Sequence, residues 1–437
     1  MAFPDRSRTN PYRLYLGMRL GMSFLAALAF TTSVVYWVKD AGLNPFQLVV
    51  LGTVLEGVYF LLQLPTGLLA DLVSRRGCVV VGVLTYAGGL VMQGASPAYL
   101  NLLLAQAVLA LGAALMSGAQ DSWAADELRE SEMTPVFLRA ARLGLVGTIA
   151  GSLLSGVLAM ISLNAPLLVS GILMAAGGLA LALLMPENHF HPRKSGAGLR
   201  RTVLQQAKKD VGEQLRASRQ ATRMVPGLFL LLGMTLFVGL WSESFDRLSG
   251  DFLLQDVTFP HVLGLEPAAW FSLISCVTSV LGFFVAGWAG RRTERLGSGA
   301  IVGMLLLFTS VTAVGVMGLS LAETFPVALM FLLLVSAARP IYEPLANGWL
   351  VVRVDSSVRA TTLSARDMFD SGGQIVGGPL VGAIGSAVSV RAALMSGAAV
   401  LVPAIVFLLG LSRKAEPAVA RRTPAEEPSL PVESLKE

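Results

Sequence analysis

Apolar stretches of about 20 residues recur along nearly the whole chain and alternate with short polar segments. Each stretch is long enough for an α-helix to cross the hydrocarbon core of a bilayer, since a helix rises about 1.5 Å per residue. The stretches with few charged residues predict twelve spans, namely 14–38, 46–70, 77–95, 99–120, 138–162, 164–185, 225–246, 266–290, 299–321, 325–350, 366–389 and 391–411. The pattern therefore predicts an all-α integral membrane protein with twelve transmembrane helices.

One long polar break, residues 186–223, separates the sixth predicted span from the seventh. It divides the chain into two blocks of six helices, residues 14–185 and 224–411. Basic and apolar residues interleave within the break, which predicts an amphipathic helix lying on the membrane surface. Residues 1–13 form a short N-terminal segment. Residues 412–437 are rich in Pro, Glu and Ala and are expected to be disordered.

The basic residues fall almost entirely on one side of the membrane if the N-terminus is cytoplasmic. Of the 33 lysines and arginines, only Lys39, Arg247 and Arg391 are placed outside, and Arg19 and Arg339 lie within spans. This split follows the positive-inside rule and predicts cytoplasmic N- and C-termini in a cell membrane. The net charge of +5 then faces anionic lipid, so nucleic acid is not needed as a partner.

The composition excludes a soluble globular protein, because 54% of the residues are hydrophobic and only 14% are charged. Cys78 and Cys276 lie in or beside apolar stretches without metal-ligand spacing, so we expect no disulfide framework, metal or cofactor. The sequence holds no HExxH, GxSxG or GxxxxGKS/T motif, which disfavours an enzyme and an ATP-driven pump. An intramembrane enzyme or a channel is a remote alternative.

Charged residues within the predicted spans mark candidate functional sites, because an ionised side chain at the bilayer centre costs roughly 2.5–3.5 kcal/mol on insertion scales. The third, sixth and ninth spans carry none, and the twelfth has only Arg391, at its outer end. This period indicates repeating three-helix units whose third helix faces lipid, as in secondary transporters. The charges within or at the ends of the other spans include Arg19, Glu56, Glu243, Asp246, Arg339, Glu343, Arg366, Asp367 and Asp370.

Several of these charges share a helix face with other polar residues. Glu56 lies on a face of the second span, Arg339 and Glu343 on a face of the tenth, and Asp370 and Gln374 on a face of the eleventh. We expect these faces to line a water-filled cavity. Glu56 either binds a proton or substrate or only packs as a buried carboxyl. Arg339 and Glu343 either form a second polar centre or neutralise each other on their own helix.

Two further predictions concern the polar spans. Pro340 and Pro344 flank the Arg339–Glu343 pair and are expected to break or kink the tenth helix. The charges near span ends, among them Glu243, Asp246 and Arg366, are more often solvated than functional. Aromatic residues near the polar faces either offer adaptable apolar contacts to a ligand or serve packing, and they are Tyr59, Phe60, Trp241, Phe245 and Tyr342.

The segment 65–76 joins the second and third spans and holds Gly67, Asp71, Arg75 and Arg76. Glycine permits a tight turn, and Asp71 can pair with Arg75 or Arg76 in an ionic latch. Here the sequence resembles the major facilitator superfamily, whose loop between helices 2 and 3 carries this pattern. The resemblance covers residues 10–411. It implies two six-helix bundles related by a pseudo-two-fold axis, rocking around a central cavity with the latch as cytoplasmic gate.

A finer resemblance concerns the fifth span. Residues 147–156 match the helix 5 motif GxxxGPxxGG of drug/proton antiporters at all but two positions, and residues 377–382 repeat it partly. Small-residue faces of this kind also serve ordinary helix packing. Val108 stands where those antiporters carry a helix 4 arginine, so their usual proton relay does not carry over. Residues 117–128, with the segment 65–76, are similar to the subgroup that includes macrolide and tetracycline exporters.

The resemblance implies a proton-coupled secondary transporter that exports amphipathic small molecules, such as drugs, by alternating access. Its partners would be the bilayer, the substrate and protons, and the chain is expected to be monomeric. Glu56 would carry the proton or bind a cationic substrate, Arg339 and Glu343 would form the second polar centre, and the further candidates are Asp370, Gln374 and Arg19. An importer, or a lipid or lysolipid transporter of the same fold, remains an open alternative.

Overall fold

Helices account for all regular structure in the residues that the computed structural model describes, which are 10–128, 133–190, 225, 227–260, 264–354 and 356–419. The N-terminal half contributes α1 (Pro11–Phe30), α2 (Ser33–Lys39), α3 (Pro45–Leu72), α4 (Arg75–Ala95), α5 (Tyr99–Met116), α6 (Ala119–Glu127), α7 (Met133–Ala159) and α8 (Ala165–Leu184). The C-terminal half contributes α10 (Leu228–Gln255), α11 (Pro267–Ser320), α12 (Phe325–Ala338), the 3-10 turn η3 (Arg339–Ile341), α13 (Tyr342–Arg353), α14 (Ser356–Ala387) and α15 (Val390–Val419).

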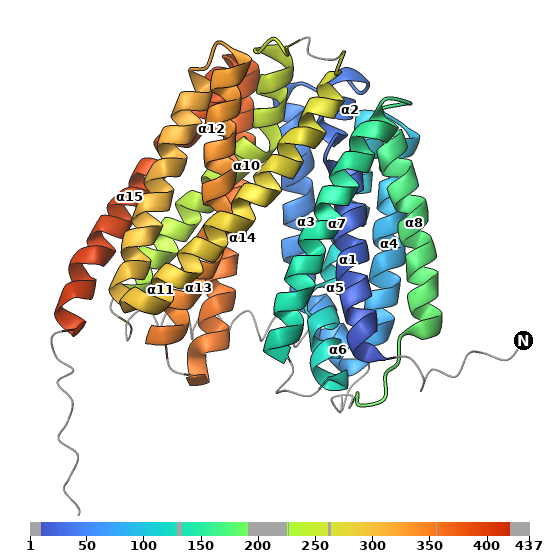
Figure 1. The fold of residues 1–437 in the computed structure, drawn as a ribbon, viewed down its shortest axis with the longest axis horizontal. Helices are drawn as coiled ribbons and strands as arrows, with labels where there is room; N and C mark the ends of the chain where they lie inside the picture. Colours follow the sequence, from blue (N-terminus) through green and yellow to red (C-terminus); the bar gives the residue numbers. More distant parts are fainter. Residues whose placement is uncertain are drawn as a thin grey trace, which may run out of the picture.

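The two halves form two helical bundles that stand side by side (Figure 1). Eleven helical stretches in the described residues are long and apolar enough to cross a membrane. The remaining predicted span, 366–389, lies in α14, which is more polar because it carries Arg366, Asp367 and Asp370. The fold is therefore the predicted all-α arrangement with twelve transmembrane helices in two six-helix bundles.

The single helix α11 carries two of the predicted spans. Its 54 residues make it far longer than a bilayer is thick. Two parts of it are apolar enough to cross a membrane, Pro267–Arg292 and Ala300–Ser320, and they correspond to the predicted spans 266–290 and 299–321. In Figure 1 the yellow part of α11 descends and its golden part returns beside it. The chain of α11 therefore reverses its direction between these two parts, and α11 supplies both the second and third spans of its bundle.

Three predicted spans are interrupted helices. The first is split between α1 and α2 at Thr31 and Thr32, and the fourth between α5 and α6 at Ser117 and Gly118, where Gly118 has a φ of 72°. The tenth is split by η3, which contains Pro340, as the prolines predicted. Helix breaks within a bundle expose backbone groups and polar side chains to the interior rather than to lipid.

Glycines let matching pairs of helices approach closely in both bundles. In the first bundle, a Cβ at Gly147 would lie 2.5 Å from the backbone oxygen of Leu20 in α1, and one at Gly151 would overlap the oxygen of Phe24. In the second, a Cβ at Gly377 of α14 would overlap the backbone oxygen of Leu240 in α10. The glycine-rich segments 147–156 and 377–382 therefore serve helix packing at equivalent places.

The bundles are joined at the end where Phe46 lies. There the backbone N–H of Phe46 in α3 donates to Ser386 Oγ of α14 at 2.9 Å, and the hydroxyls of Ser152 in α7 and Ser275 in α11 bond at 2.9 Å. Val49 of α3 packs into the core of the second bundle. We call this the joined end, and the opposite end, where the ribbons in Figure 1 diverge, the Asp71 end.

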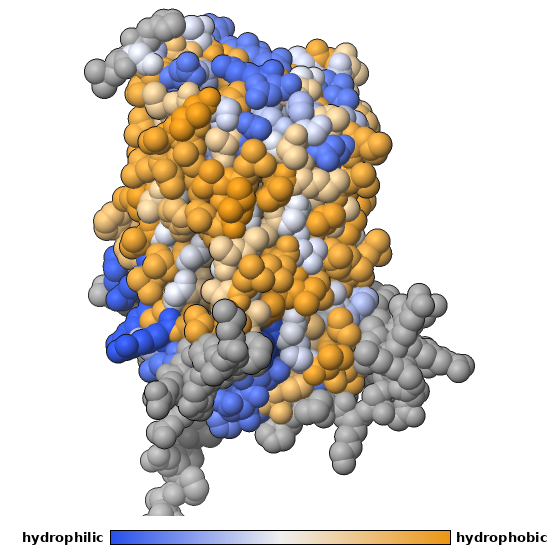
Figure 2. All heavy atoms as spheres, turned by 90° about the vertical axis from the view of Figure 1, so that its right-hand side faces the viewer, coloured by the Kyte–Doolittle hydropathy of each residue, from blue (hydrophilic) through white to orange (hydrophobic). Residues whose placement is uncertain are grey.

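The outer surface matches a membrane environment. Figure 2 shows a broad apolar band around the middle of the molecule, with hydrophilic residues gathered toward the two ends. Large apolar side chains on this surface include Leu61, Ile172, Phe284, Leu380 and Val406, which are 59% to 70% exposed. Exposure on this scale is expected where side chains face lipid rather than water.

Two predicted boundaries at the ends of the chain differ from the structure. Helix α1 begins at Pro11, inside the predicted terminal segment 1–13, because Asn10 caps it by accepting bonds from the amides that follow. Helix α15 continues to Val419, into the tail 412–437 that was expected to be disordered, since good helix formers follow the apolar span. The predicted amphipathic helix within 186–223 lies outside the described residues, apart from the segment up to residue 190.

The contact between α1 and α7 yields a test of packing. Gly151→Ala places a Cβ against the backbone oxygen of Phe24, and overpacking of this kind costs typically about 1–3 kcal/mol. Gly177→Ala in α8 meets no atom within 4 Å and replaces glycine by a better helix former. We expect the apparent melting temperature, followed by tryptophan fluorescence in detergent, to fall in the first variant and not in the second. Equal changes would contradict the packing role of Gly151.

Candidate functional site

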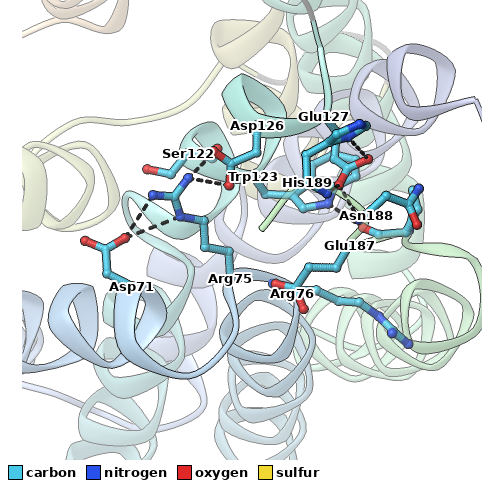
Figure 3. Close-up of polar contacts among 11 residues, drawn as sticks. Asp71, Arg75, Arg76, Ser122, Trp123, Asp126, Glu127, Glu187, Asn188 and His189 are labelled. Carbon is cyan, nitrogen blue, oxygen red and sulfur yellow. Dashed lines mark hydrogen bonds and ion pairs between the residues drawn. The ribbon is translucent and has the colours of Figure 1, made fainter. Parts of the chain in front are cut away.

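The latch at the Asp71 end is formed by Arg75, which lies between two carboxylates (Figure 3). Arg75 pairs with Asp71 of α3 at 3.1 Å and with Asp126 of α6 at 2.6 Å. It also donates to the backbone oxygen of Ser122 at 3.0 Å. Of the two pairings predicted for Asp71, the structure therefore has the one with Arg75. Gly67 lies one helical turn before Asp71, with open space beside its Cα.

Arg76 has a different role from Arg75. Its backbone N–H donates to Glu187 Oε1 at 3.0 Å, and Ser74 Oγ donates to the other oxygen of the same carboxylate at 2.8 Å. Its side chain donates to the backbone oxygen of Ala182 at 2.5 Å. Glu187 thus accepts bonds at the N-terminus of α4, where the helix dipole favours a negative charge.

Glu127 holds the chain that follows α8 against the first bundle by hydrogen bonds. Its side chain is 2% exposed and accepts hydrogen bonds from the backbone amides of Asn188 and His189, at 2.6 and 3.0 Å. The Trp123 indole N–H donates to the backbone oxygen of Pro186 at 2.6 Å. The first residues of the predicted break 186–223 therefore lie against α4 and α6 beside the latch (Figure 3).

The tenth span does not hold the internal ion pair that was considered for it. Arg339 pairs with Asp246 of α10, with its second terminal nitrogen 2.6 Å from Asp246 Oδ2, and lies over the ring of Trp241 at 5.7 Å. Glu343 instead lies 3.8 Å from Arg366 of α14. The pairing of Arg339 with Glu343 on their own helix, one of the two alternatives considered, does not occur, because η3 interrupts the helix between them and each side chain pairs with a charge on another helix.

Arg366 is a buried charge rather than a solvated helix end. The residue is 3% exposed, donates to Asn347 Oδ1, and lies 3.7 Å from Asp367. Asp370, one turn further along α14, accepts a hydrogen bond from Gln374 at 2.8 Å. The prediction that Arg366 is solvated at its span end was wrong, because α14 begins well before that predicted span and buries it.

These groups surround a cavity of about 300 Å³ inside the second bundle. Its lining includes Arg339, Glu343, Arg366, Asp370 and Gln374. Two of the predicted aromatic residues also line it, Trp241 and Tyr342, and the Tyr342 hydroxyl lies 3.0 Å from Thr235 Oγ1. The polar faces predicted for the tenth and eleventh spans are therefore brought together around one cavity.

A second ion pair lies where α10 meets α3. Glu243, 3% exposed, pairs with Arg247 at 3.3 Å, and Arg247 lies over the ring of Trp37 at 5.8 Å. The pair rests on Gly52 of α3, where a Cβ would overlap both side chains. The sequence placed Arg247 outside the membrane and Glu243 at a solvated end. Both predictions were wrong, because α10 runs on to Gln255.

Glu56 lies one turn beyond Gly52 on the same helix and is half-buried. It interacts electrostatically with Glu243, Arg247 and Asp370. Within the described residues, no hydrogen bond or ion pair holds its carboxyl group. It is therefore a carboxyl without a fixed partner, located beside the Glu243–Arg247 pair where the two bundles face each other.

A cavity of about 480 Å³ lies between the bundles on the joined side. Its lining comes from both, including Trp37, Gln106, Phe245, Arg247 and Phe271. Of the predicted aromatic residues, Phe245 lies here and packs on Trp241 with 5.6 Å between ring centres. Tyr59 and Phe60 line neither of the two cavities, and the Tyr59 hydroxyl donates to Ser117 Oγ at 2.8 Å.

Arg19 does not join this site. It is exposed and lies near the Asp71 end, where it interacts electrostatically with Tyr15, whose hydroxyl donates to Asp121 Oδ1 at 2.8 Å. Within the described ranges, no group of three or more His, Cys, Asp or Glu residues is placed to hold a metal ion.

Sequence reasoning missed Arg247, Gln106 and Trp37 as cavity residues. Arg247 follows Glu243 at a spacing of four residues, and this periodicity could have shown that the helix continues. Gln106 could have been found as the single amide side chain within an otherwise apolar stretch. For Trp37, no signal in the sequence separates a cavity residue from a packed one.

Comparison with known proteins agrees with the fold. The sequence profile of the Major Facilitator Superfamily matches residues 17–369. A bacterial homologue of the human lysosomal transporter Spinster, in an inward-facing and unoccupied conformation, superposes with a TM-score of 0.73 at 17% identity, over 97% of this chain and 100% of that one. The nucleoside transporter NupG gives a TM-score of 0.68 at 12% identity, over 92% of this chain and 99% of that one.

A peptide transporter POT in complex with sulfate gives a TM-score of 0.72 at 13% identity, over 93% of this chain and 95% of that one. No curated protein matches the sequence. At such identities the structures share only the fold, and what they transport differs. The family profile, however, spans most of the chain, including the latch and the polar helices. The chain belongs to the major facilitator superfamily of multi-pass membrane transporters.

Proposed function

We propose that the protein is a proton-coupled secondary transporter that exports amphipathic small molecules by alternating access between its two bundles. The observation that carries the proposal is Glu56. Its carboxyl group is half-buried where the bundles meet and has no fixed partner among the described residues. A carboxyl in that position can take up a proton or a cationic substrate from one side and release it to the other as the cavity changes its exposure.

The charge balance of the interior supports a proton or cation as the coupled species. The linings of the two cavities hold three acids, Asp246, Glu343 and Asp370, and three bases, Arg247, Arg339 and Arg366. Three more acids, Glu56, Glu243 and Asp367, lie next to these groups without lining either cavity. Each base is next to at least one acid. The surplus of acidic groups favours cations over anions within the low-dielectric interior.

The proposed orientation of the two ends rests on the distribution of basic residues. If the positive-inside rule holds for this chain, the Asp71 end faces the cytoplasm and the joined end faces outward. The present state is then inward-facing. Release to the outside requires the joined end to part, which breaks the bonds of Phe46 with Ser386 and of Ser152 with Ser275. The Asp71–Arg75–Asp126 latch lies at the end that must then close.

The first test of this proposal replaces the unpartnered carboxyl. Glu56→Gln keeps the size and polarity of the side chain but cannot release a proton. In liposomes loaded with a pH-sensitive dye and given a pH gradient, lipophilic cations and common antibiotics should trigger proton flux with the wild-type protein. The proton flux through the variant should be at least about tenfold lower than through the wild type, because its amide cannot carry the proton.

Glu266→Gln, at an exposed helix cap on the joined end, is the matched control and should transport like the wild type. Equal losses in the two variants would argue against a special role for Glu56. If no compound moves protons while the same vesicles take up a metabolite or flip a lipid, the protein is an importer or a lipid transporter of this fold.

The second test concerns the contact that joins the bundles. Gly52→Ala places a Cβ against the ends of the Glu243 and Arg247 side chains, so this ion pair has to shift and the packing between α3 and α10 is disturbed. Gly57→Ala on the same helix meets nothing within 4 Å. Spin labels at Ile161 and Leu321, both strongly exposed, report the distance between the bundles once Cys78 and Cys276 are replaced by alanine.

We expect the distance distribution between the labels to shift toward longer values in Gly52→Ala and to stay at the wild-type value in Gly57→Ala. The shift reflects a population moved from the joined state toward the outward-open one. An unchanged distribution in Gly52→Ala would show that this contact does not hold the joined end together.

A further inference from the structure

The cavity between the bundles contains two buried polar side chains that the fold leaves unsatisfied. Gln106 of α5 is 1% exposed, and neither its amide nitrogen nor its amide oxygen has a hydrogen-bond partner in the described residues. The indole N–H of Trp37 in α2, 4% exposed, is also without an acceptor. Both residues line the same 480 Å³ cavity. A buried polar group without a partner is costly, so its retention calls for a ligand.

Arg247 completes this group from the other bundle. Its guanidinium lies over the Trp37 ring at 5.8 Å, and its Nε donates to Glu243 at 3.3 Å. No further acceptor for Arg247 is found among the described residues. The indole and guanidinium groups can only donate, and the Gln106 amide can both donate and accept. The polar atoms of Gln106 and Trp37 have almost no exposed surface, so they reach a ligand only when these side chains turn toward the cavity. Turned in this way, they and Arg247 offer mainly donors, which suit a hydrogen-bond acceptor on the ligand.

The charges around these three residues determine which kind of hydrogen-bond acceptor on the ligand fits. Arg247 is neutralised by Glu243, and Asp246, which also lines the cavity, is neutralised by Arg339. Glu56 lies nearby without lining the cavity, and in its ionised form it would repel a carboxylate. An uncharged acceptor, such as the carbonyl of a ketone, amide or ester, meets the donors without that repulsion.

The rest of the lining is aromatic. Phe30, Phe245 and Phe271 line the cavity together with Trp37. Aromatic faces pack against flat apolar groups of varied shape, and a volume of about 480 Å³ accommodates a ligand of drug size. The cavity therefore fits a molecule with an apolar, often aromatic, body that carries a neutral carbonyl.

We infer that Gln106, Trp37 and Arg247 form a subsite that binds the uncharged carbonyl group of an amphipathic substrate. This inference rests on the proposed transport of amphipathic compounds and names a class of them. Two of the three residues belong to the first bundle and Arg247 to the second. When the joined end parts, Arg247 moves away from Trp37 and Gln106. The carbonyl group then loses the hydrogen bond from Arg247, which weakens substrate binding in the outward-open state, from which the substrate is released.

The subsite can be tested by equilibrium binding to the full-length protein in lipid nanodiscs, without any ion gradient. The probes are a neutral ketone, 6-propionyl-2-(dimethylamino)naphthalene, and a matching anion, 6-(dimethylamino)-2-naphthoate. Emission of the ketone reports hydrogen bonding at its carbonyl, and empty nanodiscs correct for partition into lipid. We expect saturable binding of the ketone, with an affinity at least about tenfold higher than that of the carboxylate.

Gln106→Leu should weaken binding of the ketone about tenfold and shift the emission of the bound probe toward shorter wavelengths, as loss of one hydrogen bond predicts. Trp37→Phe, which keeps a ring under Arg247 but removes the N–H, should act in the same direction. Gln93→Leu is the matched control. Gln93 is equally buried and equally unpartnered in the same bundle but does not line the cavity. It should bind the ketone like the wild type.

Three results would overturn the subsite: no saturable binding of the ketone to the wild type, equal losses in Gln106→Leu and Gln93→Leu, or tighter binding of the carboxylate. Glu56→Gln should still bind the ketone, because Glu56 is not part of the subsite. If Glu56→Gln keeps the wild-type proton flux while Gln106→Leu weakens ketone binding, proton coupling at Glu56 is contradicted and the carbonyl subsite is supported. If Glu56→Gln loses the flux while Gln106→Leu binds the ketone like the wild type, the transporter proposal is supported and the subsite is contradicted.

Discussion

The need to keep ionised side chains away from lipid governs the interior of this protein. An unpaired charge in the membrane costs several kcal/mol, and the guanidinium groups at the two cavities, those of Arg247, Arg339 and Arg366, each lie against a carboxylate. Arg339 finds Asp246 on another helix, and Arg366 finds Glu343. These cross-helix pairs fix how α10, α13 and α14 face one another. They also bring their polar sides to one cavity, which explains why the chemistry of the bundle is gathered there rather than spread along its spans.

Charge pairing across helices requires that the backbones come close, and small residues make this possible. The contact of α7 with α1 and that of α14 with α10 use glycines at equivalent places in the two halves. Both halves also interrupt a helix at the corresponding point, at Ser117 and Gly118 in the first and at η3 in the second. Close packing and helix breaks thus recur with the pseudo-symmetry of the fold, whereas the charges themselves are concentrated in the second half.

The sequence predicted the architecture well, because apolar length and charge distribution depend on the membrane and not on tertiary detail. It predicted the latch at Asp71 because the residues involved are close in the chain. It could not predict pairings between distant helices. It left open whether Arg339 pairs with its neighbour Glu343, and in the structure the partner of Arg339 is Asp246 of α10. Arg247 was placed outside the membrane, since hydropathy fell at Asp246 and a polar cavity inside a bundle has the same signature as an exposed helix end.

The position of Glu56 connects charge to conformation. Gly52, one turn before Glu56, is in contact with the Glu243–Arg247 pair of the opposite bundle. Parting of the bundles at the joined end therefore removes both a cation and an anion from the neighbourhood of Glu56. In the proposed mechanism the charge of Glu56 is coupled to the equilibrium between joined and parted states. Because such coupling is reciprocal, a ligand that shifts this equilibrium would also shift the charge of Glu56. The contact between α3 and α10 is then the place where a proton, a substrate and the motion of the bundles would be linked.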